Sequence, residues 1–229
     1  MKTSIPKNNV RFYFCLVGVY AALAAALMVP SPVQAASQTW TNAPTDSTWI
    51  NILNWNAEAV PGADNMTGNT INADVATFTN AIPDDLIGSA TNPIKTDDAT
   101  IAGDRSRQIS GITFDTVNCG AYVFSGTTPT VYPGTGILYV SHNGSITMNP
   151  PVTNSETFLL PVLIRLPSST AGIYNLVNNS TDSDATMQFD SVTNDSANTR
   201  GTTFVLNGQN TGTNTIYTLS EGLAPAGRG

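Results

Sequence analysis

Charged residues are scarce in this chain. Of its 229 residues, 9 are Lys or Arg and 16 are Asp or Glu, so that 11% are charged, against about 25% in an ordinary soluble domain. The formal net charge of −7 argues against a nucleic-acid partner, because such proteins need a basic surface to displace counterions from phosphates. The chain has one His and two Cys, too few cysteines for a disulfide scaffold or a four-cysteine zinc site.

Uncharged polar residues take the place of the missing charges. The sequence contains 32 Thr and 23 Asn. Hydrophobic residues make up 41% of the chain, which is high for a disordered protein. This composition predicts a secreted, all-β, folded protein.

The first 35 residues have the layout of a secretory signal peptide. Three basic residues precede an almost wholly apolar run, Phe12 to Val29, which is followed by two prolines and by Val33-Gln34-Ala35. A membrane anchor is the alternative, since about 18 apolar residues are the lower limit of a span, but the helix breakers and the small residues favour cleavage after Ala35. Six bases and all 16 acids lie beyond this site, which gives the mature chain a formal charge of −10.

The mature chain divides into two predicted parts. Residues 36–107 are interpreted as an N-terminal cap with loops, and they carry Trp40, Trp49 and Trp55 followed by the turn signal Pro61-Gly62. Residues 108–229 contain short β-strand candidates about 9 to 16 residues apart, with β-branched or aromatic residues at alternate positions. Turn signals separate them, among them Asn143-Gly144. The predicted strands are 109–115, 121–125, 136–140, 145–149, 158–166, 173–177, 186–193, 202–207 and 214–219.

Two all-β architectures fit this pattern. One is a β-sandwich and the other is a solenoid of stacked coils. Asn and Thr in successive strands can form side-chain ladders along a stack, and the low charge suits faces on which neighbouring strands repeat the same side chains. The residues by themselves leave both architectures open.

Three segments of the chain carry familiar motifs. The first is the tryptophan segment that ends in Val75-Ala76-Thr77-Phe78, the second is Ile109 to Asp115 with Ala121 to Gly126, and the third is the Gly- and Asn-containing coil from Thr202 to Gly212. Together they resemble a group of bacterial surface proteins that carry autotransporter-associated β-strand repeats. The resemblance implies an exported right-handed parallel β-helix with a tryptophan-containing N-terminal cap, displayed on or released from a Gram-negative-type bacterium, at the outer membrane or outside the cell.

The sequence departs from that group in two respects. No Trp occurs after Trp55, where the full repeat usually carries one, and no barrel or sorting helix follows the last coil. We therefore expect the chain to be the N-terminal part of a longer passenger, with coils that are truncated at Gly229 and a continuation of the same polypeptide that is missing.

Candidate catalytic and metal-binding residues are few. His142 is interpreted as a turn residue that closes a strand, because the chain has no nucleophile elbow of the Gly-x-Ser-x-Gly type. Cys119 is interpreted as a small buried residue. Three acid pairs could act on glycosides or bind Ca²⁺, but they lie in polar stretches and are interpreted as solvated surface charge. These pairs are Asp84-Asp85, Asp97-Asp98 and Asp182-x-Asp184.

The sequence therefore predicts a non-enzymatic surface or secreted protein with no catalytic site, metal or cofactor. It would act as a structural spacer or an adhesin toward an extracellular polysaccharide or a cell-surface partner. The alternative is a carbohydrate-binding module or a polysaccharide-active β-helix enzyme. In that alternative, Trp40, Trp49 and Trp55 could contact a glycan.

Overall fold

The structure is a computed structural model that describes residues 37–64, 72–83, 86–97, 106–126, 136–164, 171–195 and 202–223. The predicted signal peptide and its cleavage site at Ala35 lie outside these ranges. The described elements are almost all strands: β1 (Gln38–Thr39), β2 (Ala63–Asp64), β3 (Val75–Phe78), β4 (Ile94–Lys95), β5 (Ser106–Phe114), β6 (Val123–Ser125), β7 (Ile137–Met148), β8 (Glu156–Ile164), β9 (Gly172–Asn178), β10 (Met187–Asp195), β11 (Thr202–Asn207) and β12 (Thr215–Leu223), with a short 3₁₀ helix, η1 (Ile52–Asn54).

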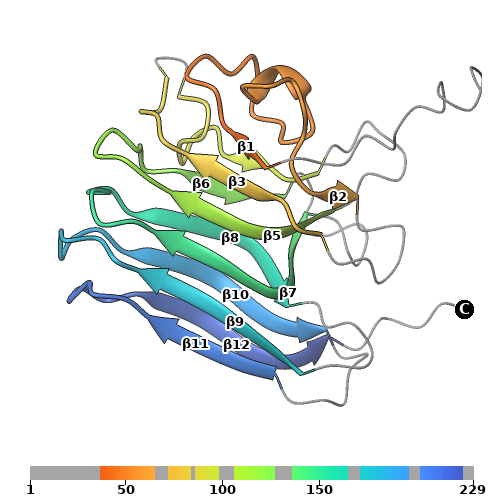
Figure 1. The fold of residues 1–229 in the computed structure, drawn as a ribbon, viewed down its shortest axis with the longest axis vertical. Coiled ribbons are helices and arrows are strands. Elements are labelled where there is room, and N and C mark those ends of the chain that lie inside the picture. Colours follow the sequence, from red (N-terminus) through yellow and green to blue (C-terminus); the bar gives the residue numbers. More distant parts are fainter. Residues whose placement is uncertain are drawn as a thin grey trace, which may run out of the picture. The chain divides into compact units, whose positions relative to one another are not determined.

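The strands stack as the coils of a parallel β-solenoid (Figure 1). A first wall contains β1, β3, the second halves of β5 and β7, then β9 and β11. A second wall contains β4, β6 and the first parts of β8, β10 and β12. A third wall contains the first halves of β5 and β7 and the ends of β8, β10 and β12, each paired with the next strand in this order. Because the pairs within these walls are parallel, the structure confirms the β-helix and excludes the β-sandwich.

Successive strands of the first wall are separated by similar numbers of residues. Val75 pairs with Gly111, and Gly111 pairs with Ser145. Ser145 then pairs with Asn175, and Asn175 pairs with Val205, so that a coil takes about 30 to 36 residues. This repeat brings side chains from distant parts of the sequence into columns that run along the stack.

The interior of the solenoid is an apolar column. Phe124, Phe158 and Phe189 occupy one register position on three successive coils, with ring centroids 4.8 and 4.7 Å apart and interplanar angles of 12° and 10°. All three rings are buried. Stacking of this kind adds to the free energy gained from burial of the rings, and it fixes the register between the coils.

The sequence-predicted strands are found from residue 106 onward, with one correction. Residues 136–140 and 145–149 were expected to be separate strands joined by a turn at Asn143-Gly144, but they form the single long strand β7. Asn143 has a φ of 59°, and the pairing with β5 shifts register between Ile109 and Gly111. The Asn-Gly pair therefore makes a corner between the third and first walls without reversing the chain. A Cβ at Gly144 would collide with the backbone oxygen of Ser110, so that this corner requires glycine.

The stack also begins before the predicted boundary at residue 108. β3 pairs in parallel with β5, β4 pairs in parallel with β6, and residue 108 itself lies inside β5. The cap covers the edge of the coil that β3 and β4 begin, through a bridge between Thr48 and Lys95 and through the pairing of β1 with β3.

Candidate functional site

The three tryptophans of the N-terminal cap are buried in the core. Trp40 and Trp49 have no exposed surface and Trp55 is 1% exposed. The rings of Trp40 and Trp55 meet edge to face with centroids 5.0 Å apart, and Trp49 packs at 5.0 Å from Trp55. The expected glycan contact at these residues is thereby corrected, because stacking on a sugar requires an exposed ring face, and these rings contact one another and Phe78 instead.

Hydrogen bonds hold the tryptophan cap closed. The indole nitrogen of Trp49 donates to the carbonyl of Pro61 at 3.0 Å, and that of Trp55 donates to the carbonyl of Trp49 at 2.7 Å. The buried Asn54 amide donates to Asp46 Oδ1 at 2.9 Å. Burial by itself would raise the pKa of Asp46, but its hydrogen bonds, including that from Asn54, outweigh burial and lower this pKa. These contacts make the cap a fixed lid on the solenoid.

A buried carboxyl lies below the cap, at the start of β8. Glu156 has no exposed surface; its Oε2 accepts from the Tyr122 amide at 2.9 Å, and its Oε1 lies 3.8 Å from the Cys119 sulfur. Burial raises the pKa of Glu156 well above its usual range, although these two hydrogen bonds oppose the rise. Burial, with the Coulombic effect of Glu156 next, also raises the pKa of the Cys119 thiol. Protonated groups of this kind are poor nucleophiles, and they fit a structural role.

Of the predicted acid pairs, the structure describes Asp97, Asp182 and Asp184. Asp84-Asp85 and Asp98 lie outside the described residues. Asp97 is 1% exposed, which corrects its interpretation as surface charge. Asp182 and Asp184 lie in the turn before β10, where Asp182 Oδ1 accepts from the Asp184 amide at 2.9 Å. This hydrogen bond stabilises the turn, which gives the pair a structural role.

The single histidine is not in a turn, as the sequence suggested, but in the middle of β7. His142 is half-buried, and its Nδ1 has no hydrogen-bond partner. It lies between the buried Ser141 and the corner at Asn143. Ser141 Oγ accepts from the side-chain amide of Gln108 at 3.1 Å. Among the residues that the structure describes, no group therefore binds Nδ1 of His142 and orients the ring as a base.

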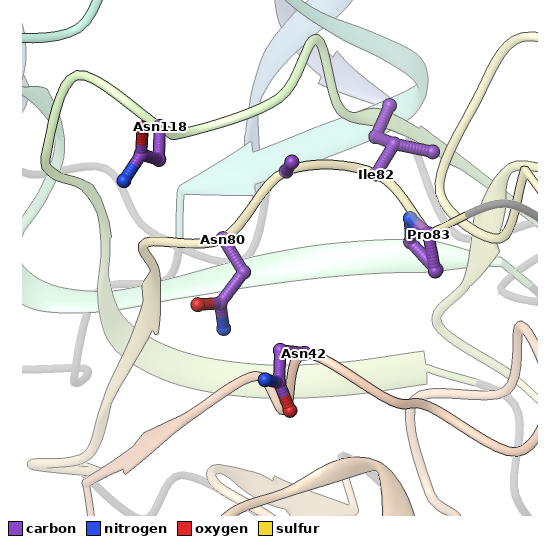
Figure 2. Close-up of a pocket in the computed structure, with 6 residues that line it drawn as sticks. Asn42, Asn80, Ile82, Pro83 and Asn118 are labelled. Atoms are coloured by element: carbon purple, nitrogen blue, oxygen red, sulfur yellow. The ribbon is translucent and has the colours of Figure 1, made fainter.

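An open depression of about 470 Å³ lies beside the cap. Figure 2 shows Asn42, Asn80 and Asn118 around it, with Ile82 and Pro83 at one side. The side-chain amide of Asn80 donates to the carbonyl of Trp40 at 2.9 Å, which fixes that residue. Asn42 and Asn118 are exposed. Amides can donate to and accept from hydroxyl groups, so the depression can bind a polar uncharged group.

A row of threonines lies on the outer side of the first wall. Thr39, Thr77, Thr113 and Thr147 occupy the same register position on successive strands, and each is half-exposed. Neighbouring strands are about 4.8 Å apart, so the hydroxyls repeat at about that spacing. The row continues through Val177 and Asn207. These residues form a narrow and regular strip without charged side chains, which we call the threonine strip.

The sequence indicated the composition of this strip but not its position. Thr77, Thr113 and Thr147 each lie directly before a buried core residue, namely Phe78, Phe114 and Met148. The recurring Thr-Phe or Thr-Met pair is the sequence pattern from which the position of the strip could have been predicted. Glu156 was missed, although the alternation that places Phe158 and Leu160 inside also places Glu156 inside.

Across the described ranges, no three His, Cys, Asp or Glu side chains come together as a metal site would require. Within the same ranges, no helix combines the length and the hydropathy that a membrane crossing needs. No known protein family, curated protein or solved structure matches the chain.

Proposed function

We propose that the chain is an exported, non-enzymatic β-helix segment that acts as a spacer or adhesin, at the cell surface or in the surrounding medium. The observation that carries this proposal is the threonine strip on the first wall, formed by Thr39, Thr77, Thr113 and Thr147. The signal-peptide layout of residues 1–35 supports export. The motifs that resemble autotransporter-associated repeats support a bacterial surface passenger.

The chemistry of the strip favours an uncharged, hydroxyl-rich partner. Threonine hydroxyls donate and accept hydrogen bonds. The residues two positions before Thr77, Thr113 and Thr147 are Val75, Gly111 and Ser145, and none of them is charged. A strip without charge neither repels a neutral polymer nor requires the removal of counterions. An extracellular polysaccharide or a glycan on another cell is therefore the proposed partner.

Deletion of the chain in the producing cell tests the proposal. We expect the loss of surface attachment or of cell-surface architecture. A complementing variant with Thr77→Glu, Thr113→Glu and Thr147→Glu should be exported in equal amount but should not restore attachment, because carboxylates on the strip bind solvent strongly and repel acidic surfaces.

A matched control adds the same three charges elsewhere. Leu53, Val117 and Leu159 are 51%, 62% and 53% exposed, and they lie in η1, in the turn after β5 and on the outer side of β8. The Leu53→Glu, Val117→Glu, Leu159→Glu variant should restore attachment. Equal attachment with and without the gene, or equal loss in both triple variants, contradicts an adhesive role of the strip.

The Asn-lined depression favours a second candidate, a carbohydrate-binding module. The exposed amides of Asn42 and Asn118 would contact the sugar hydroxyls. On a glycan array, an Asn42→Ala, Asn118→Ala variant should lose a signal that the triple threonine variant keeps. If the threonine variant loses the signal and the asparagine variant keeps it, the strip is the binding surface instead.

A further inference from the structure

Three asparagines that are far apart in the sequence come together beside the cap. Asn42 follows β1, Asn80 follows β3 and Asn118 lies in the turn after β5. Because β1, β3 and β5 are neighbours in the first wall, the segments that leave their ends bring these residues to one place. The depression between them has a volume of about 470 Å³, which lies within the range of about 300–1,000 Å³ of small-molecule sites.

Hydrogen bonds fix the wall of the depression that carries Asn80. Its backbone carbonyl accepts from the Gly120 amide at 3.0 Å and from the Tyr122 hydroxyl at 2.9 Å. Its side-chain amide donates to the carbonyl of Trp40 at 2.9 Å. A Cβ at Gly120 would lie 2.7 Å from the backbone nitrogen of Ile82, so that glycine allows this segment to pack closely against the turn after β5. The wall is thus formed before a ligand arrives, and binding does not have to order it.

The lining restricts the chemistry of a ligand. Among the described residues, those that line the depression include neither a charged nor an aromatic side chain. A charged ligand would find no opposite charge there, and a sugar ring would find no aromatic face on which to stack. Recognition therefore falls to the asparagine amides and to the aliphatic side chains beside them.

Two kinds of surface border the depression. Asn80 and Asn118 lie to one side of it, and Ile82 and Pro83 lie to the other (Figure 2). Side-chain amides both donate and accept hydrogen bonds, whereas the carbon atoms of Ile82 and Pro83 favour contact with an apolar group. A ligand that satisfies both surfaces has a donor and an acceptor next to a small apolar group. An acetamido group combines an N–H, a carbonyl and a methyl group in this way.

From these observations we propose that the depression binds the acetamido group of an N-acetylated sugar. The N–H and the carbonyl of that group form hydrogen bonds with the exposed amides of Asn42 and Asn118, and its methyl group lies against Ile82 and Pro83. The sugar ring stays at the open mouth of the depression, where the next sugar of a chain can continue into solvent. This assignment rests on the carbohydrate-binding candidate function, and it adds the class of sugar.

Saturation-transfer NMR on the purified, exported protein tests the proposal with two sugars that differ only at C2. N-acetylglucosamine carries the acetamido group there, and glucose carries a hydroxyl. We expect N-acetylglucosamine to bind at least about tenfold more tightly, because glucose loses the hydrogen bonds and the methyl contact of that group. Its acetyl methyl protons should receive the strongest saturation. N-acetylglycinamide, which has the acetamido group without a sugar ring, should bind more weakly than N-acetylglucosamine.

A pair of variants places the binding in the depression. Asn42→Ala, Asn118→Ala should lower the affinity for N-acetylglucosamine at least about tenfold. Because both side chains are exposed, thermal unfolding of this variant should match that of the unmodified protein. The control variant Asn56→Ala, Gln209→Ala removes two other exposed amides, and it should bind like the unmodified protein.

The possible failures are distinguishable. Equal affinity for glucose and N-acetylglucosamine, lost in Asn42→Ala, Asn118→Ala, would overturn the acetamido assignment and leave the carbohydrate-binding candidate in place. No binding of either sugar, even well above millimolar concentration, would contradict both. N-acetylglycinamide that binds as tightly as N-acetylglucosamine would point to a peptide ligand and overturn the sugar. On the unmodified protein, saturation centred on the ring protons instead of the acetyl methyl would also overturn the assignment.

Discussion

Glu156 is the residue whose ionisation is most closely linked to folding. It is an acid without exposed surface, its described contacts are the Tyr122 amide and the Cys119 sulfur, and burial raises its pKa well above 4.5. The folded state therefore holds a proton that the unfolded state releases more easily. By linkage, this contribution to stability is complete below about pH 4.5, and it is lost as the pH rises toward the raised folded pKa.

Replacement of this carboxyl by an amide should remove that dependence. In a Glu156→Gln variant, the free energy of unfolding should no longer fall between about pH 4.5 and the raised pKa, where the unmodified protein loses up to about 1.4 kcal/mol per pH unit. Urea denaturation at several pH values measures the slope. Glu58→Gln changes an exposed carboxyl and should leave the slope as it is; identical slopes in the unmodified protein and Glu156→Gln would refute the linkage.

Some single residues could be predicted from the sequence and others could not. The burial of Cys119 was expected from its type, and it is confirmed. The buried Glu156 and Asp97 were not expected, because acids of their type are almost always exposed. The tryptophans were assigned to the cap correctly, but the sequence left open whether their rings face the core or a glycan, since both uses favour the same residue type.

At the scale of elements, the stacked phenylalanines fix the second wall. Phe158 lies between Phe124 and Phe189, and it stacks on both. A Phe158→Ala variant leaves a cavity in the middle of this column, and we expect a loss of about 3–5 kcal/mol in the free energy of unfolding. Leu159→Ala, one residue further along and 53% exposed, should cost less than about 0.5 kcal/mol. Chemical denaturation measures both, and similar costs for the two variants would contradict the column.

The turns between coils are held by asparagines. The side-chain amide of Asn210 donates to the carbonyls of Ser180, Asp182 and Ala185 in the preceding coil, at 3.2, 2.6 and 3.3 Å. An Asn210→Asp variant would place a carboxylate against three carbonyl oxygens, and it should destabilise the protein by about 1–3 kcal/mol.

The neighbouring Gln209 provides the control for this turn. It is exposed, and Gln209→Glu introduces the same charge one residue away, with an expected cost of less than about 0.5 kcal/mol. Thermal unfolding of both variants is the measurement. Equal stability of Asn210→Asp and Gln209→Glu would show that the hydrogen bonds of Asn210 do not hold the turn.

The strands were predictable because their side chains alternate, but their register was not. The pattern of Phe158, Leu160 and Val162 places one face of β8 in the core. Which strand lies beside β8 depends on the length of each coil, and this length varies from one coil to the next. The corner in β7 was misread as a turn, since Asn-Gly pairs favour tight reversals as well as isolated left-handed residues.

At the scale of the whole molecule, the fold separates three surfaces with different properties. The cap closes one end over buried tryptophans, the first wall carries the uncharged threonine strip, and the opposite end exposes Leu206 and Leu219.

Export to the cell surface is the claim on which the proposed function depends, and one measurement tests it most directly. An epitope inserted after Thr213, in the exposed turn between β11 and β12, can be probed with antibody on intact producing cells and in the culture medium. The account predicts labelling on the surface or in the medium, with a mature N-terminus after Ala35. A chain found inside the cell with residues 1–35 still attached would contradict it.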